Sequence, residues 1–301
     1  MGLPAIPHHT SLALLLISIS VAATPGAQLP KAGTVPDLLI EAPSEFAAAR
    51  ERVESFDRER LRGVMRLVGL TDSGPPIRVL LASEDSELAR QVSSSIAGFA
   101  AGTESLVVLF PSRSPAYPDD TLEDVLHHEV AHVLITRASG GRSLPTWFHE
   151  GLATTAERTW GIEDQARVLR ERAFLSHTSL DEVNELFESD DGSRAGAYAL
   201  AGAFVRDLIN AHGPSAPGDI MRRIAAGESF DSAFAQVTKQ SLADAEAAFW
   251  DRNRFWARWG PFLMTPSALW MIVTLIALAA IIRRRQKSAA LRKRWADEGL
   301  D

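Results

Sequence analysis

The stretch DDTLEDVLHHEVAHVLITR, residues 119–137, lies near the middle of the chain and dominates its expected fold. We expect it to form one helix, capped at its start by Asp119 or Asp120 and ended by the Gly-Gly pair that follows. Residues four apart lie on the same face of a helix, so His128 and His132 present two imidazoles to one point. Apolar residues surround the pair, which is typical of a core-facing helix. Two histidines on a buried face need a common reason, and a metal ion supplies one.

Glu129 directly follows the first of these histidines. Helical geometry turns it about 100° away from that histidine, so its carboxylate can face the water that the metal activates instead of the metal itself. The pattern His-Glu-x-x-His therefore predicts two metal ligands, His128 and His132, with Glu129 as the general base of a hydrolase. Two hydrogen-bonded core histidines beside an incidental glutamate are the alternative.

A second motif, WFHEGLA at residues 147–153, supplies a third candidate ligand. Glu150 lies eighteen residues after His132, a gap that accommodates the end of one helix, a turn and the start of another. A catalytic zinc site has three protein ligands and one open position. His128, His132 and Glu150 meet this count, and the chain has no cysteine that could serve instead.

Together, HEVAH and WFHEGLA resemble the gluzincin metallopeptidases, in particular the peptidase MA-like bacterial proteins related to thermolysin and to zinc aminopeptidases. The resemblance is strong over the two motifs and extends more weakly from Ile77 to about Gly213. It implies a zincin fold with a strand-bearing N-terminal part and a helical C-terminal part, Zn²⁺ as the cofactor, and Glu150 as the third ligand. It also implies that 105–110 is the edge strand along which an extended peptide substrate is held.

The chain departs from this family in two places. Relatives often carry an acidic residue one turn after the glutamate ligand, where it orients a zinc-bound histidine. Here that position is Thr154. No amine-binding motif of the GxMEN type precedes HEVAH, which argues against a typical aminopeptidase.

A weaker match lies in AYALAGAFV, residues 197–205. Related enzymes carry a tyrosine at the start of a comparable helix, and its hydroxyl hydrogen-bonds the oxyanion. By this resemblance Tyr198 is the candidate oxyanion stabiliser. A tyrosine that only packs between helices is the alternative. His149 is a further candidate to line the site, and it otherwise shapes the start of its helix. Arg194 and Arg206 could assist carboxylate or oxyanion binding, although nothing in their spacing demands it.

The remaining pattern predicts an α+β fold in which strands come first and helices follow. A turn is expected between Gly98 and Gly102, and Gly69 is expected to end the first long helix. Strands are expected at 37–41, 77–82 and 105–110. Helices are expected at 45–68, 83–92, 119–137, 147–158, 165–174, 195–211, 219–225 and 242–258.

Both ends of the chain carry apolar segments. Residues 12–22, LALLLISISVA, have the length of a signal peptide, with a cleavage site after Ala23; an uncleaved anchor is the alternative. Residues 263–282 are free of charge and long enough to cross a membrane as a helix. Basic residues follow directly, so the positive-inside rule places the C-terminus in the cytoplasm. A buried core helix is the alternative for this segment.

These features divide the chain into five expected parts. They are a signal peptide at 1–23, a linker at 24–36, a zincin-like peptidase domain at 37–260, a transmembrane helix at 263–282 and a basic cytoplasmic tail at 283–301. The apolar content of 46% predicts a packed core, and the net charge of -7 offers no basic face for nucleic acid.

The sequence thus predicts a single-pass membrane protein whose catalytic domain lies outside the cytoplasm. Its expected activity is the Zn²⁺-dependent hydrolysis of a peptide or protein substrate. The alternative is a catalytically inactive zincin-like binding or scaffold module on the outer side of the membrane.

Overall fold

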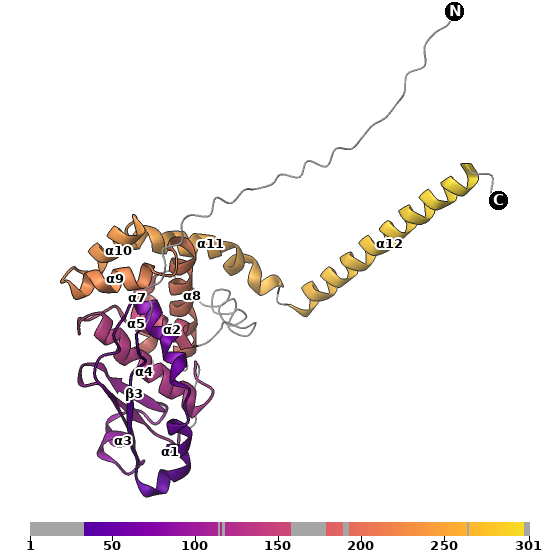
Figure 1. Cartoon of the computed structure of the whole chain (residues 1–301). Helices are drawn as coiled ribbons and strands as arrows, with labels where there is room; N and C mark the ends of the chain where they lie inside the picture. Colours follow the sequence, from indigo (N-terminus) through magenta and orange to yellow (C-terminus); the bar gives the residue numbers. More distant parts are fainter. Residues whose placement is uncertain are drawn as a thin grey trace, which may run out of the picture.

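The computed structural model describes residues 33–113, 115, 118–157, 179–188, 193–263 and 265–297. These residues form a mixed α+β fold, with a small sheet in the N-terminal part and helices from residue 122 onward (Figure 1). The expected order of strands before helices is confirmed. The expected signal peptide, most of the expected linker and the expected helix at 165–174 lie outside the described residues.

The sheet has four strands in the order β1-β2-β4-β3. The first three in this order run parallel, and β3 pairs with β4 in the antiparallel direction. Apolar side chains dominate β2 and β4, and Val107, Val108 and Leu109 are fully buried, as expected for interior strands. The strands are β1 Leu38–Glu41, β2 Ile77–Leu81, β3 Gly98–Ala101 and β4 Leu106–Leu109.

The edge strand differs from the one expected. The segment 105–110 was expected at the edge, but β4 lies inside the sheet and β3 forms the edge beside α4 (Leu122–Ala138). A turn was expected where β3 lies, because Gly98 and Gly102 are typical of turns. Their role here is close approach to α4. A Cβ on Gly98 would lie 2.7 Å from a methyl group of Val125, and one on Gly102 would overlap Thr136.

The expected single helix at 45–68 is also wrong. The chain forms α1 (Ala47–Glu54), breaks, and continues as α2 (Leu61–Val68). Between them the side chain of Asp57 accepts a hydrogen bond from the backbone N–H of Glu59 at 3.0 Å and starts a new turn. Gly69 ends α2 in the left-handed conformation, as predicted.

Helix α4 carries the His-Glu-x-x-His motif through the centre of the domain. Its cap is Thr121, whose hydroxyl oxygen accepts from the N–H of Asp124 at 3.2 Å, so the expected capping by Asp119 or Asp120 is wrong. The helix lies against β3 and β4 on one side and against α2 and α5 on others, which explains why it is apolar around most of its circumference. The helix ends at Ala138, and the Gly-Gly pair that was expected to end it follows after one intervening residue with positive φ.

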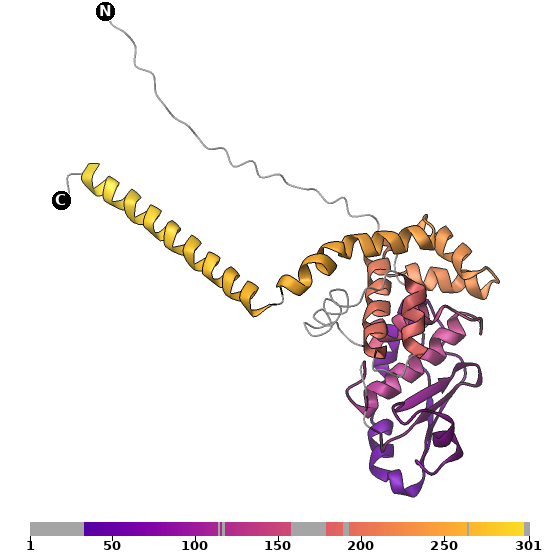
Figure 2. The same ribbon diagram turned by 180° about the vertical axis from the view of Figure 1, so that it is seen from behind.

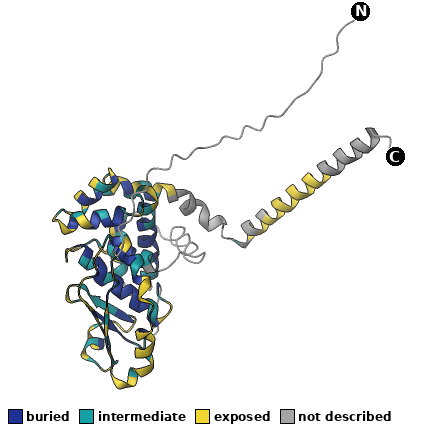
Figure 3. Cartoon of the chain, viewed as in Figure 1, coloured by how far each residue is buried: buried dark blue, intermediate teal, exposed yellow. Residues whose placement is uncertain are grey.

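The helices that follow cover α4 on the side away from the sheet. In both views α9 and α10 occupy the end of the body opposite to α1 and α3 (Figures 1 and 2). Buried residues concentrate between these ends, where α4, α5 and α8 meet (Figure 3). The bounds are α3 Glu87–Gln91, α5 Thr146–Glu157, α7 Leu180–Glu188, α8 Arg194–His212, α9 Ala216–Ala225, α10 Phe230–Thr238 and α11 Leu242–Leu263.

The last helix, α12 (Pro266–Asp297), projects away from the body (Figures 1 and 2). It exposes large apolar side chains, among them Trp270 at 68% and Ile276 at 64%. A search of the described residues finds no helix that is both long and apolar enough to cross a membrane. Several side chains of the expected span at 263–282 lie outside the described residues, and the span stays a prediction.

Close packing of α5 on α8 generates a prediction about stability. A Cβ on Gly151 would lie 2.6 Å from the carbonyl oxygen of Ala201, so Gly151→Ala should force the two helices apart and lower the free energy of unfolding by about 1–3 kcal/mol. Gly63→Ala is the matched control, because its Cβ would meet only one atom, at 3.9 Å, and helix propensity should raise stability by about 0.5–1 kcal/mol. Urea unfolding of both variants measures the difference; equal effects would contradict the close contact.

Candidate metal centre

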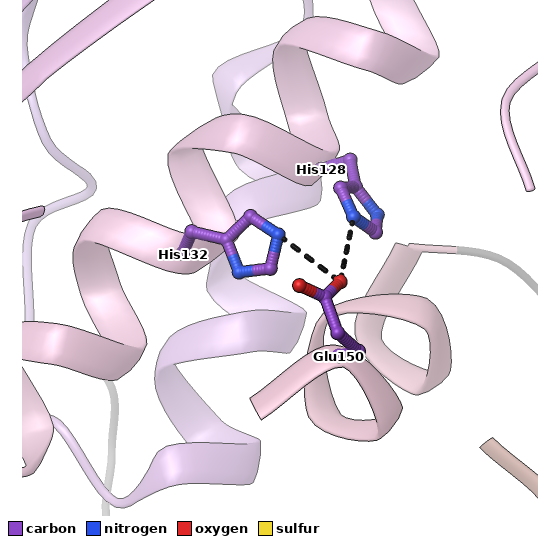
Figure 4. A group of neighbouring side chains, drawn as sticks. All are labelled: His128, His132 and Glu150. Carbon is purple, nitrogen blue, oxygen red and sulfur yellow. Dashed lines mark ion pairs between the residues drawn. The ribbon is translucent and has the colours of Figure 1, made fainter. Parts of the chain in front are cut away.

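Three potential ligand atoms meet between α4 and α5 (Figure 4). The Nε2 atoms of His128 and His132 lie 3.5 Å and 3.4 Å from the same oxygen, Oε2 of Glu150. All three atoms lie within 4.8 Å of one another. The two histidines point from one helix toward a carboxylate on the other, and this group could hold a metal ion.

Local packing places the carboxylate on α5. The backbone N–H of Trp147, unsatisfied within its own helix, donates to the side-chain oxygen of Asn184 on α7 at 2.9 Å. The indole of Trp147 packs edge-on against Phe148 and Phe204, and both Trp147 and Phe148 are buried. The first turn of α5 is therefore held by both a hydrogen bond and aromatic packing, and Glu150 follows in the next turn.

The residues present fit a metal ion. Oε2 of Glu150 is buried and makes no hydrogen bond of normal geometry to any described residue. Burial by itself raises the pKa of this carboxyl, but the neighbouring rings of His132 and His128 outweigh it and hold the pKa well below its ordinary value. The group therefore offers an ionised carboxylate and two imidazole nitrogens, a donor set that suits zinc and other first-row transition metals.

Glu129 lies beside this group without belonging to it. Its side chain is buried and lines the same cavity as the three ligand candidates. Burial raises its pKa, and the negative charge of Glu150 adds to the rise, while both histidines oppose it. A carboxylate with a raised pKa accepts a proton more readily than one in water, which is the property that a general base requires.

Tyr198 reaches the site from α8. Its ring meets that of His128 at a centroid distance of 5.8 Å and an interplanar angle of 76°. Burial, followed by the charges of Glu150 and Glu129, raises its pKa well above the ordinary value, so its hydroxyl stays protonated and can donate a hydrogen bond. Its ring also packs against Phe187 at 5.1 Å.

The structure brings all the sequence-predicted site residues to one cavity of about 460 Å³. These are His128, Glu129, His132, Glu150 and Tyr198. The edge strand β3 forms a wall of the same cavity through Gly98, Phe99 and Ala100.

Two further histidines flank the ligand pair in sequence. His149 lines the cavity and stacks on His132, and burial lowers its pKa to about 3. His127 points instead toward Phe56, with ring centroids 6.1 Å apart, and burial lowers its pKa to about 4. Among the described residues, His127 belongs to neither the ligand group nor the cavity lining.

Sequence reasoning missed Phe187 as a residue of the site, because α7 was not predicted. The apolar spacing of Leu180, Val183 and Phe187 was the available signal. Arg194, a candidate for carboxylate or oxyanion binding, lines the cavity, with its Nε donating to the backbone oxygen of Phe187 at 3.0 Å. The other candidate, Arg206, is not among the described residues that line it.

Comparison with known proteins gives no family for this chain. No protein-family model matches the chain, and no curated protein matches it. The resemblance to gluzincins therefore depends on the two motifs together with the geometry of the ligand group.

The ligand group predicts metal binding that a single substitution removes. His132→Ala takes away one of three ligands, so the affinity for a divalent metal should fall by more than about 100-fold, beyond the usual effect of changing an outer-shell partner. Elemental analysis of the purified protein measures the bound metal. His212→Ala is the control, since His212 lies at the end of α8 next to Gln240. Equal metal content in the two variants would exclude this site.

Proposed function

We propose that this chain is a membrane-anchored zinc metallopeptidase of the gluzincin type. The observation that carries the proposal is the convergence of two imidazoles and a carboxylate on one point, with Glu129 in the same cavity. Three protein ligands beside an open cavity are what a catalytic zinc site needs, whereas structural zinc sites are closed by four.

In this proposal His128, His132 and Glu150 hold the ion. When bound, Zn²⁺ supplies a Lewis acid that polarises the scissile carbonyl and lowers the pKa of water. Glu129 accepts the proton of the attacking water and passes it to the leaving amine. Its burial favours proton uptake, because a raised pKa makes the carboxylate a stronger base, and release follows because the leaving nitrogen is more basic still.

Tyr198 acts as the hydrogen-bond donor to the oxygen of the scissile carbonyl as negative charge develops on it. Two observations support this role: its ring lies against that of His128, and its hydroxyl stays protonated. A preorganised donor in a buried site stabilises such charge without having to reorient.

The substrate in this proposal is a peptide or protein segment in extended form. An edge strand has unpaired backbone N–H and C=O groups that can pair with an added strand. Strand β3 is such an edge in the described sheet, and it borders the cavity that contains the ligand group. A peptide paired with β3 would therefore run past His128 and His132, so β3 takes the role that the sequence resemblance implied for β4.

The proposed location is a membrane surface outside the cytoplasm. The supporting observations are the apolar segments near both ends of the sequence and the basic cluster that follows residue 282. Figure 3 colours a long part of α12 as exposed. The large apolar side chains exposed there, such as Trp270 and Ile276, also favour contact with an apolar phase.

The assignment of the general base is tested by Glu129→Gln. This variant keeps the ligand group, so it should retain its metal while the kcat for peptide hydrolysis falls by about 10²–10⁴-fold. The matched control is Glu123→Gln on the same helix, whose carboxylate is paired with Arg52 away from the cavity. Cleavage of a peptide library by the purified full-length protein provides the measurement.

Three outcomes separate the candidate functions. Loss of cleavage in Glu129→Gln, with cleavage retained in Glu123→Gln, supports the peptidase. Undiminished cleavage in that variant contradicts the assigned base. A wild-type protein that binds metal but cleaves no peptide contradicts the peptidase and favours the inactive binding module.

The role of Tyr198 is tested by Tyr198→Phe. Loss of one oxyanion donor should lower kcat by about 10²–10³-fold, because the hydrogen bond strengthens only as charge develops. KM should change little, since the ring and its contacts with His128 and Phe187 remain. A variant with unchanged kcat would show that Tyr198 serves packing alone.

A further inference from the structure

The orientation of the His132 ring lacks the usual support. Its Nε2 faces Glu150, and its Nδ1 is buried without a hydrogen bond to any described residue. In metal sites this second nitrogen normally donates to a carboxylate or a carbonyl, which fixes the plane of the ring. Thr154 stands where relatives often carry an orienting acid, and its hydroxyl is likewise buried without a hydrogen bond in the described part of the chain. Among the described residues, a stacking contact can hold the ring.

That contact is the imidazole of His149. The rings of His132 and His149 lie face to face, with centroids 4.6 Å apart and planes inclined by 17°. His128 meets the same ring edge-on, at 4.7 Å and 88°. Turning the His132 ring out of this plane about its Cβ–Cγ bond would break the parallel stack, so the stack fixes the plane in which Nε2 faces Glu150.

We propose that His149 is a positioning residue that holds the His132 ring in its metal-binding orientation by stacking, in place of a hydrogen-bonding partner. The inference rests on the proposed metal site and names no role for His149 in the reaction itself. Its physical basis is twofold. Offset or stacked aromatic pairs are attractive beyond the area that they bury. A ring that donates its electrons to a cation also becomes partly positive, and a π face stabilises such a ring.

The position of His149 in the sequence adds to the effect. It directly precedes Glu150 on α5, whereas the ring that it supports belongs to α4. When α5 packs against α4, a single turn of α5 therefore places both Glu150, the third ligand, and His149, which supports the ring of His132. The two contributions cannot separate without moving the start of α5, which Asn184 and the aromatic contacts of Trp147 hold in place.

The test compares His149→Ala with His149→Phe in the purified full-length protein. Alanine removes the ring, and phenylalanine keeps a flat ring while removing both nitrogens. His149→Ala should bind Zn²⁺ about 10–100-fold more weakly, the usual effect of removing an outer-shell partner, and His149→Phe should stay within about threefold of wild type. Competition with a chromophoric chelator measures the affinity. The visible spectrum of the Co²⁺-loaded protein should change for alanine and not for phenylalanine.

Two results would overturn the inference. Wild-type affinity in His149→Ala would show that the ring needs no support. A loss of Zn²⁺ affinity in His149→Phe equal to that in His149→Ala would show that metal binding depends on a ring nitrogen of His149 and not on the stacked ring. His212→Ala and His212→Phe form the control pair, and circular dichroism of the metal-free variants shows that each is folded.

The metal measurements also keep this inference separate from the proposed function. A wild-type protein that binds Zn²⁺, shows the expected alanine and phenylalanine behaviour and cleaves no peptide would contradict the peptidase and support the role of His149. A wild-type protein that binds neither Zn²⁺ nor Co²⁺ would overturn both.

Discussion

The burial of two carboxylates between α4 and α5 is the constraint on which the rest of the structure depends. Glu129 and Glu150 are desolvated beside the rings of His128 and His132, and taking an ionised carboxylate out of water costs several kcal/mol unless opposite charge compensates it. The rings of His128 and His132 supply partial compensation, and a cation between them would supply the remainder. The domain keeps an arrangement that a purely apolar core would avoid, which is typical of a functional site rather than a structural one.

Packing holds most of this arrangement in place, together with hydrogen bonds such as the one from Trp147 to Asn184. Helix α4 is enclosed by the sheet and by its neighbouring helices, and Gly98 of β3 and Gly102 directly after it allow the edge strand to approach it closely. Gly151 allows the same closeness between α5 and α8, which carry Glu150 and Tyr198. The buried Nδ1 of His132 has no hydrogen-bond partner among the described residues. The geometry of the site therefore depends on how closely these side chains and helices pack.

The errors in the sequence predictions have specific physical causes. Gly98 and Gly102 were taken as turn residues because glycine is the common residue of turns, whereas here both are needed for close contact with α4. The 45–68 segment was predicted as one helix, since nothing in its apolar spacing marks the break that Asp57 caps. Thr121 caps α4 in preference to the two aspartates before it, a choice that local preference alone does not make.

The sequence by itself determined that His128 and His132 face one point and that Glu129 turns away from it, because helical periodicity is a property of adjacent residues. It also supplied Glu150 through spacing, ligand count and family resemblance. Only the tertiary structure decided that β3 is the edge strand beside the ligands, that Phe187 lines the cavity and that His149 stacks on His132. These features join segments far apart in the chain, and their contacts arise from how buried surfaces fit together, which no local pattern specifies.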